Sequence, residues 1–352
     1  MKKAIALFFL TLYSSFLFAC STFLLNKDGQ LVFGRNYDWV TGNGAVMINA
    51  RGIKKTSFAP DGGKAITWVS DCGSVTFNQF GKEFPHGGMN ERGLVVELMW
   101  LSETTYPIAD QRAAMNELQW IQYQLDNAAT VSEVIASDSV IRISRQNAAP
   151  LHYLIADAHG DAATIEFING EMKVHRGKDL PNPVLTNTVY ADAMRQVTGS
   201  DARTTSYGDN SVDRFAMACR MVQQFQTTAI KAPAVDYTFS ILDKIAQGSF
   251  TQWRIAYDIT NRQVHFETQD QGQRKTLSFK DVDFACNTSS TYFPLSNKQK
   301  GNIATYFSPL SFQQNQALIE QSARESQGRI DIPPASIAQA AAYMNTTQCG
   351  NK

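Results

Sequence analysis

The chain has 352 residues, with 32 Lys and Arg against 32 Asp and Glu, so its formal net charge is zero. Without a basic stripe or a charged run, the sequence argues against a nucleic-acid partner or binding to an anionic membrane surface. Beyond the N-terminal segment no apolar run is long enough for a transmembrane helix, so we expect no membrane span after processing. No repeat or long linker divides the chain, and we expect a single domain over residues 20–352.

The N-terminus has the three parts of a secretory signal peptide. A basic Met-Lys-Lys start is followed by the apolar run 4–18 and then by Ala19, a small residue at the expected cut. Removal of residues 1–19 would make Cys20 the first residue of a periplasmic or secreted protein. A cysteine at that position carries a thiol and a free α-amino group, with reference pKa values of about 8.5 and about 7.7–8.0, so one residue holds both a nucleophile and a base.

Two other interpretations of Cys20 compete with catalysis. In bacterial lipoproteins the residue at this junction is also a cysteine, and its thiol takes a lipid. The residues before the cut, Leu-Phe-Ala, are close to that signal, although Phe18 is bulky where a small residue is usual. The chain would then be a lipid-anchored envelope protein with a binding or structural role. A cysteine of no consequence is the third interpretation, and the junction alone does not separate the three.

The residues that follow Cys20 predict a β-hairpin. Residues 20–25 and 31–39 have the composition of strands, and between them stands an Asp-Gly dipeptide at 28–29, which suits a tight two-residue loop. With that dipeptide as the loop, Cys20 faces Tyr37 across the strand pair.

Two charged residues of the return strand fall near the thiol in this register. Arg35 shares a face with Cys20, because side chains alternate with a period of two, and Asp38 lies one residue beyond Tyr37. A guanidinium near a thiol favours the reactive thiolate, and a carboxylate near the terminal amine can orient it and hold its proton. Either residue alone is better explained as half of a surface ion pair, but their joint spacing from Cys20 favours a catalytic site.

At this point the chain resembles a known family. Cys20 followed by Phe-Gly-Arg-Asn-Tyr-Asp-Trp at 33–39 resembles the start of the choloylglycine hydrolases, N-terminal-nucleophile (Ntn) amidases that include conjugated bile salt hydrolases and penicillin V acylases. Arg35 lies 15 residues after Cys20 and Asp38 lies 18 after it, one residue closer than in the family pattern. The resemblance implies a four-layer αββα sandwich of the Ntn-hydrolase type, with no metal and no organic cofactor.

A second match leads to an oxyanion-hole position. The sequence Asn-Glu-Arg-Gly-Leu at 90–94 resembles the family's Asn-Glu-Lys-Gly-Leu turn, and counting from Asn90 puts that position at Trp100. Bile salt hydrolases typically have Asn there and Gram-positive penicillin V acylases have Tyr, so Trp100 departs from the pattern. It could donate from its indole or its backbone N–H, or its ring could fill the acyl pocket; both interpretations stay open.

Later matches supply two more candidate residues. The sequence at 184–188 resembles the Leu-Thr-Asn-Ser/Gln-Pro motif without its proline, and implies that Asn187 donates to the developing oxyanion. The sequence at 210–215 resembles a Ser-x-x-Arg-Phe motif that opens a helix, which implies that Arg214 is the second active-site arginine and that Ser211 caps the helix. Residues 248–268 resemble the family's late hairpin.

The order of predicted elements indicates an α+β fold with helices packed on a sheet. Strands occupy the chain to about residue 100 and again near 151–189, and a hairpin spans about 251–278. Helices are expected at 111–127, 211–226, 233–247 and through much of a C-terminal segment at about 308–345.

The remaining cysteines and the histidines give no metal-ligand pattern. None of the five cysteines forms a CxxC pair, and the five histidines are scattered and are best explained as ordinary strand and loop residues. Export would permit disulfides, and we expect Cys286 to pair with Cys349 because they flank the C-terminal segment.

Together these patterns predict a hydrolase that cleaves a linear amide bond of an N-acylated small molecule through a Cys20 thioester. Penicillin V or an N-acyl homoserine lactone is the favoured substrate, and Trp100 argues against a bile salt preference. Conjugated bile salt hydrolysis, acyl transfer on the same fold, an inactive acyl-binding relative and assembly into a homo-oligomer stay open. The candidate site residues are Cys20, Arg35, Asp38, Trp100, Asn187 and Arg214.

Overall fold

The first sheet of the molecule carries the predicted hairpin. The computed structural model describes residues 20–146, 148–198, 210–286 and 290–350; the predicted signal peptide, 1–19, lies outside them. The strands of this seven-stranded sheet are, in spatial order, β14 (Val184–Leu185), β1 (Ser21–Lys27), β2 (Gln30–Asp38), β15 (Thr251–Asp258), β16 (Gln263–Thr268), β17 (Lys275–Ser278) and β19 (Gly301–Asn302). All neighbours are antiparallel except β17 and β19.

A second, nine-stranded sheet is antiparallel throughout. Its strands are, in spatial order, β13 (Glu171–Arg176), β12 (Ala162–Ile168), β11 (Leu151–Ala156), β8 (Val95–Trp100), β7 (Pro85–Asn90), β6 (Ser74–Asn78), β3 (Ala45–Asn49), β18 (Thr291–Pro294) and β20 (Ser308–Pro309). Two small sheets complete the strands: β21 (Gln348–Cys349), β4 (Ile53–Thr56) and β5 (Thr67–Val69), and the parallel pair β9 (Ala113–Met115) and β10 (Ile141–Ile143).

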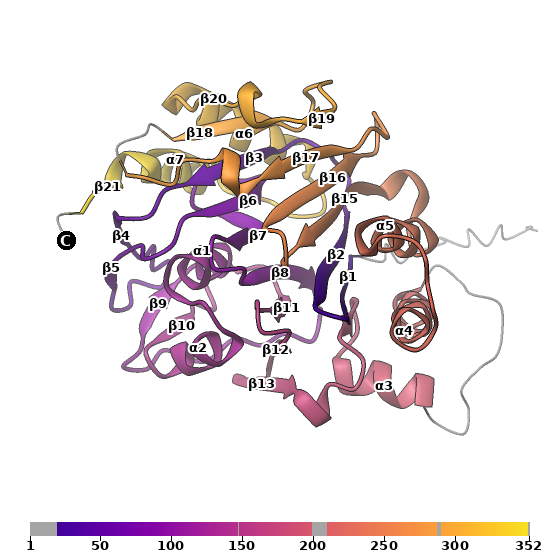
Figure 1. The fold of residues 1–352 in the computed structure, drawn as a ribbon. Coiled ribbons are helices and arrows are strands. Elements are labelled where there is room, and N and C mark those ends of the chain that lie inside the picture. The colour runs from indigo at the N-terminus through magenta and orange to yellow at the C-terminus, as the bar shows by residue number, and fades with distance from the viewer. Residues whose placement is uncertain (1–19, 147, 199–209, 287–289, 351–352) are drawn as a thin grey trace, which may run out of the picture.

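The two large sheets face each other and bury a common core. Phe23 and Phe33 of the first sheet belong to the same apolar cluster as Phe77, Met99 and Leu154 of the second. Helices α4 (Ser211–Thr227) and α5 (Ala234–Lys244) pack on β1, β2 and β15, while α1 (Glu117–Asn127) packs on β7 and β8. Figure 1 shows α4 and α5 on one side of the sheets and α1 with α2 (Val131–Ala136) on the other. The predicted αββα sandwich is thereby confirmed.

Local sequence explains where the helices begin. The side chain of Asn116 caps α1, and Thr130 with Glu133 forms a capping box at α2. The helix expected at 111–127 therefore starts later than predicted, because residues 113–115 pair with β10 instead. Two short helices, α2 and α3 (Tyr190–Thr198), were not expected from the sequence.

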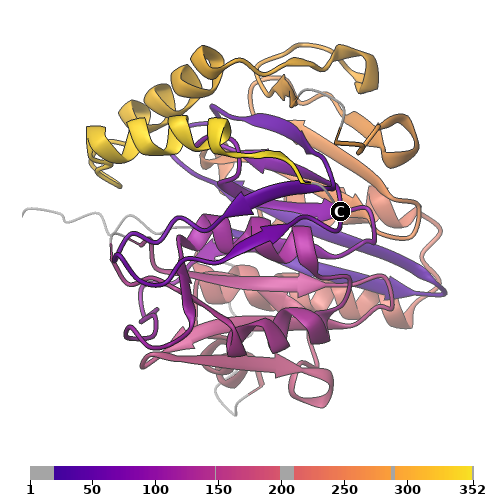
Figure 2. The ribbon, with the colours of Figure 1, turned by 90° about the vertical axis from the view of Figure 1, so that its left-hand side faces the viewer.

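The C-terminal segment is helical as expected. It forms α6 (Phe312–Glu325) and α7 (Pro334–Tyr343), which lie together along one edge of the sandwich in Figures 1 and 2. Past α7 the chain ends at β21, which pairs with β4 and carries Cys349. Cys349 is joined to Cys286, which confirms the predicted disulfide.

Candidate active site

The hairpin has the register expected from its turn. Lys27 pairs with Gln30 and Ser21 with Asn36, while the loop residues Asp28 and Gly29 have φ values of 51° and 77°. A type I′ turn needs positive φ at both central positions, which explains the Asp-Gly dipeptide. Cys20 immediately precedes β1 and therefore lies beside the end of β2, as predicted.

Arg35 reaches the sulfur of Cys20 from β2. Its Nη2 lies 4.0 Å from Sγ, and the side chain is buried. The other terminal nitrogen, Nη1, donates to Glu97 Oε2 and to the carbonyl oxygen of Leu98, both at 2.5 Å. Glu97 comes from β8 in the facing sheet, so this buried ion pair joins the two sheets beneath the thiol.

Burial has the largest effect on the pKa of the Cys20 thiol. Burial raises the pKa of Cys20 to about 11; Arg35 lowers it and Asp38 raises it, with smaller effects than burial. Arg35 favours the thiolate, as expected, but desolvation of the charged form outweighs the guanidinium, so the thiol stays protonated near neutral pH. A base must take the thiol proton when the sulfur attacks.

Asp38 presents one oxygen that nothing in the described part of the chain satisfies. Its Oδ1 accepts a hydrogen bond from the Thr251 hydroxyl, while Oδ2 is buried without a hydrogen-bonding partner among the described residues. Burial raises the pKa of this carboxyl to about 6, although Arg214 lowers it. A buried, unpartnered carboxylate oxygen is costly, so it marks a position where a donor would be strongly stabilised.

Arg214 joins the nucleophile to the predicted oxyanion residue. Its Nη1 donates to the carbonyl oxygen of Cys20 at 2.8 Å and to Ser21 Oγ at 2.7 Å. Its Nη2 donates to Asn187 Oδ1 at 3.1 Å. The residue lies on the first turn of α4, as expected, and is buried.

The predicted helix cap at Ser211 is wrong. Asn210 caps α4, because its side chain accepts from the backbone N–H of Asp213. Ser211 Oγ instead accepts from the backbone N–H of Asn187 at 2.9 Å and from the Thr188 hydroxyl at 2.7 Å. It therefore fixes the backbone that carries Asn187.

The side-chain amide of Asn187 is held at both ends. Because Oδ1 accepts from Arg214, the nitrogen must face the other way, and Nδ2 donates to the carbonyl oxygen of Trp100 at 2.8 Å. An amide nitrogen carries two hydrogens, so this contact occupies one and leaves the other available. Trp100 itself is half-buried and its side chain lines the pocket beside Cys20.

A buried pair beneath Asn187 was missed at the sequence level. His152 Nε2 lies 2.6 Å from the carbonyl oxygen of Thr186, and its Nδ1 lies 3.1 Å from Glu166 Oε1. Glu166 Oε1 also accepts the backbone N–H of Tyr190. Because a carbonyl oxygen can only accept, Nε2 of His152 is the donor to Thr186 and helps to fix the backbone next to Asn187. From the sequence, His152 was expected to be an ordinary strand histidine.

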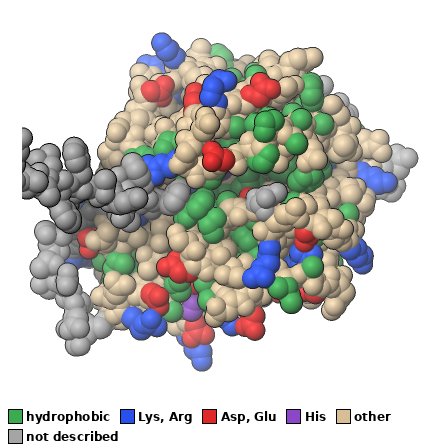
Figure 3. Space-filling view, turned by 180° about the vertical axis from the view of Figure 1, so that it is seen from behind, with side chains coloured by type: hydrophobic (Ala, Val, Ile, Leu, Met, Phe, Trp, Pro, Cys, Tyr) green, Lys and Arg blue, Asp and Glu red, His purple; other side chains and the backbone are tan. Residues whose placement is uncertain are grey.

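A cavity of about 690 Å³ opens beside Cys20. Its aromatic lining comprises Tyr37, Trp39, Phe58, Phe80, Phe84 and Trp100. Its aliphatic lining includes Leu98, Leu118, Leu151, Ile319, Ile330 and Ile337. The face of the molecule in Figure 3 is hollowed near its centre, and hydrophobic side chains gather round the hollow, in keeping with this lining. The size and composition suit a small ligand with an apolar group.

Comparison with known proteins identifies the family. Residues 20–223 match the model of linear amide C–N hydrolases, choloylglycine hydrolase family, and the match begins at Cys20. The chain belongs to the choloylglycine hydrolase family. All six candidate residues lie within the matched range, and the chain is a linear amide C–N hydrolase.

Individual relatives agree with this membership. The chain is 28% identical to a penicillin V acylase of Pectobacterium atrosepticum, over 80% of this chain and 86% of that protein. Its fold is similar to that of a penicillin V acylase from Agrobacterium tumefaciens, with a TM-score of 0.71 and 23% identity over 83% of this chain and 98% of that one. A conjugated bile acid hydrolase variant from Clostridium perfringens gives 0.67 and 15%, over 80% and 98%.

Other features of this family member lie away from the thiol. A hollow of about 920 Å³ beside the hairpin loop is lined by Lys27, Asp28 and Lys231 among others, and it contains none of the candidate residues. In the described ranges, no group of three or more His, Cys, Asp or Glu residues is arranged to hold a metal ion. The same ranges contain no helix long and apolar enough to span a membrane.

Proposed function

We propose that this protein is an exported acylase that hydrolyses small N-acyl amides with an apolar acyl group, penicillin V among them. One observation carries the proposal: the Cys20 thiol lies at the wall of an apolar cavity of about 690 Å³. The same sulfur is 4.0 Å from Arg35. The acyl group would occupy the cavity, so that its carbonyl carbon lies against the sulfur.

Processing between Ala19 and Cys20 would supply the base. Cleavage frees the α-amino group of Cys20, a residue whose Sγ lies 3.8 Å from the carbonyl oxygen of Asp38. We expect the unpartnered Oδ2 of Asp38 to accept a hydrogen bond from this amine. The family match that begins at Cys20 supports this cut. Since burial keeps the thiol protonated, with its pKa raised to about 11, the free amine takes the proton as the sulfur attacks.

The remaining steps use groups already in place. Attack of sulfur on the carbonyl carbon gives a tetrahedral oxyanion, which the second N–H of Asn187 Nδ2 stabilises. The ammonium of Cys20 then protonates the leaving nitrogen, the C–N bond breaks, and a thioester remains. Water, deprotonated by the same amine, attacks the thioester and releases the carboxylic acid and the thiol. Arg214 holds both Asn187 and the Cys20 backbone throughout.

The lining of the cavity bears on which acyl group is preferred. Six aromatic residues line it, and aromatic side chains favour stacked or edge-to-face contacts with a ring such as that of a phenoxyacetyl group. The ring of Trp100 occupies pocket surface where a small polar residue would leave room. Two relatives are named penicillin V acylases. These observations favour penicillin V over conjugated bile salts, with N-acyl homoserine lactones as the second class to test.

The test is a comparison of amide substrates with exported, purified protein. We expect release of 6-aminopenicillanic acid from penicillin V, with slower or no release of glycine from glycocholate. Hexanoyl homoserine lactone tests the second class. Cleavage of glycocholate faster than both others would overturn the substrate assignment, while undiminished hydrolysis by Cys20→Ala would overturn the mechanism.

Lipid attachment at Cys20 is the rival from another class of protein. A lipid on the sulfur and an acyl group on the amine would block both reactive groups. That interpretation leaves the contacts of Arg35, Asp38, Asn187 and Arg214 around Cys20 unexplained.

A further inference from the structure

The C-terminal segment, residues 312–349, forms one wall of the cavity beside Cys20. It contributes Ile319 from α6, Ile330 and Ile332 from the connection, and Ile337 and Ala340 from α7. This segment lies outside residues 20–223, which carry the family match and all candidate catalytic residues. One part of the chain thus holds the reacting groups, and another closes the space that the acyl group would enter.

The C-terminal end of α6, within this segment, is attached to residues that follow strand β2. The indole nitrogen of Trp39, the residue after Asp38, donates to Ser326 Oγ at 2.9 Å. Asn43 Nδ2 donates to Ser322 Oγ at 2.8 Å on the last turns of α6. These contacts fix the wall relative to the residues around the thiol.

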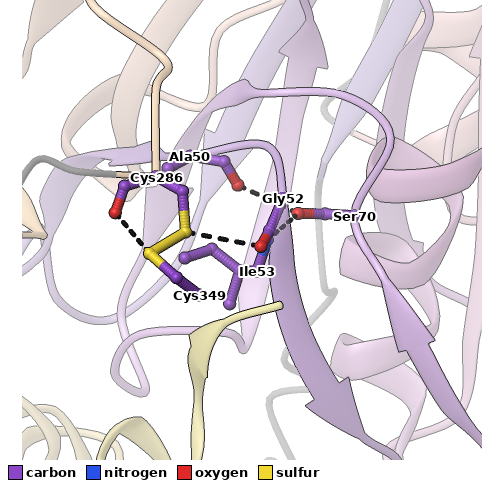
Figure 4. The surroundings of a disulfide bond; sticks show 6 residues. All are labelled: Ala50, Gly52, Ile53, Ser70, Cys286 and Cys349. Atoms are coloured by element: carbon purple, nitrogen blue, oxygen red, sulfur yellow. Dashed lines mark hydrogen bonds between the residues drawn. A yellow bond between two sulfur atoms is a disulfide. The ribbon is translucent and has the colours of Figure 1, made fainter. Parts of the chain in front are cut away.

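The C-terminal end of the segment is clamped by the disulfide. Cys349 is bonded to Cys286 and pairs with Ile53 on β4, as Figure 4 shows in the surroundings of Gly52. The Tyr343 hydroxyl, at the end of α7, donates to the carbonyl oxygen of Thr56 at 2.7 Å. Strand β4 ends two residues before Phe58, which lines another side of the cavity. The disulfide and β21 therefore hold α7 next to β4, the strand that precedes Phe58 in a second wall of the cavity.

We propose that the C-terminal segment determines which acyl groups this enzyme accepts. The face of α7 that carries Ile337 and Ala340 limits the length of the acyl group, and the Cys286–Cys349 disulfide keeps that face in position. The ligand class is a carboxylic acid, or its amide, with an unbranched or aryl-substituted apolar chain. The inference rests on the proposed function, because it assumes that the acyl group enters this cavity.

The first test measures binding rather than turnover, so that it can fail separately from the catalytic proposal. Isothermal titration of the Cys20→Ala protein with butanoate, octanoate, dodecanoate and phenoxyacetate gives a chain-length profile. We expect Ala340→Trp to weaken dodecanoate binding at least tenfold while changing butanoate less than twofold. Ala338→Trp is the matched control, because Ala338 lies on the same helix but is exposed and outside the cavity lining.

Three results would overturn the inference: equal effects on long and short acids, equal effects of the two tryptophan variants, or no acid binding by the parent protein. If the chain-length effect appears but wild-type protein cleaves none of the tested amides, the role of the C-terminal segment in limiting acyl length is supported. The proposed acylase activity is then contradicted.

The second test removes the clamp. The double variant Cys286→Ser, Cys349→Ser releases the face of α7 that limits chain length, so it should lower the dissociation constant for dodecanoate several-fold and change that for butanoate little, with far-UV circular dichroism unchanged. If this variant does not fold, Ile337→Ala serves instead, and it should improve binding of dodecanoate relative to butanoate. An unchanged chain-length profile in the folded variant would contradict a role for the clamp.

Discussion

Arg35 divides its guanidinium between Glu97, at 2.5 Å from Nη1, and the sulfur of Cys20, at 4.0 Å from Nη2. Burial raises the pKa of Glu97 to about 7, although Arg35 lowers it, so the carboxyl is largely ionised in mildly alkaline solution. Its negative charge then counters the guanidinium that would otherwise favour the thiolate. Glu97 thus sets how strongly Arg35 acts on the nucleophile.

The substitution Glu97→Gln should therefore lower the pKa of the Cys20 thiol. The neutral amide of that variant can still accept a hydrogen bond from Arg35, but it no longer offsets the positive charge. The pH dependence of iodoacetamide alkylation measures the thiol pKa, and Glu171→Gln, at an exposed ion pair, is the control. A thiol pKa that rises in the Glu97 variant would contradict this account.

Removing the nucleophile should leave the fold intact and abolish turnover. Cys20→Ala should lower kcat by more than about 10³-fold, since loss of the attacking group removes the covalent step. Cys20→Ser should retain the fold and lose most activity. Both variants are compared with wild type by circular dichroism and by release of 6-aminopenicillanic acid, and a rate within tenfold of wild type for Cys20→Ala would rule out the thioester route.

Loss of the Asn187 amide should affect the chemical step. A side-chain donor aimed at an oxyanion contributes about 10²–10³-fold to kcat, so Asn187→Ala should lower kcat by that amount with KM nearly unchanged. Steady-state kinetics on penicillin V separates the two constants. A large rise in KM at constant kcat would instead assign Asn187 to ground-state binding.

Asp38 should produce an acid limb in the pH profile. Its pKa is raised to about 6 by burial, and the ionised form is the one that can hold the terminal amine. Activity should therefore fall as pH decreases through about 6, or through a lower value where a protonated amine beside the carboxylate lowers its pKa. The profile of kcat/KM gives this value, and Asp38→Asn should lose the limb together with most activity. The same limb in Asp38→Asn would assign it to another group.

The His152–Glu166 pair should affect catalysis indirectly, because His152 contacts Thr186 and so helps to position Asn187. His152→Gln takes the imidazole from buried Glu166, which keeps the backbone N–H of Tyr190 and, at 3.7 Å from Oε2, the ring of His175. Loss of one member of a buried pair costs up to about 3–5 kcal/mol in unfolding free energy. The substitution also removes the hydrogen bond to Thr186, so kcat should fall more than KM rises. The double variant with Glu166→Gln should recover part of the stability, as a double-mutant cycle by urea denaturation would measure. Additive losses would contradict direct coupling between the two residues.

The parts of the site that sequence could predict are those with local signals. The Asp-Gly loop set the register that brings Arg35 beside Cys20, because turn type and strand alternation act over a few residues. The family motifs pointed to Asn187 and Arg214. In the structure Asn187 contacts Trp100 and Arg214 contacts Cys20, so these residues lie in one site.

Residues that lie far apart in sequence were not predictable in this way. Glu97 meets Arg35 only because two sheets face each other, and His152 meets Thr186 only through the packing of β11 against the chain near β14. The extent of burial at Cys20 likewise depends on the whole core, which is why the raised pKa of the thiol could not be predicted from the sequence. Asn210 caps α4 instead of Ser211, because the Ser211 hydroxyl is hydrogen-bonded to the backbone N–H of Asn187.

The central claim is that Cys20 is a free N-terminal nucleophile, and one measurement tests it most directly. Intact mass spectrometry with N-terminal sequencing of the exported protein reports both the cut and any modification. We predict a chain that begins at Cys20 with an unmodified amine and thiol. A mass raised by a diacylglyceryl and a fatty acyl group, or a chain that retains residues before Cys20, would contradict the mechanism.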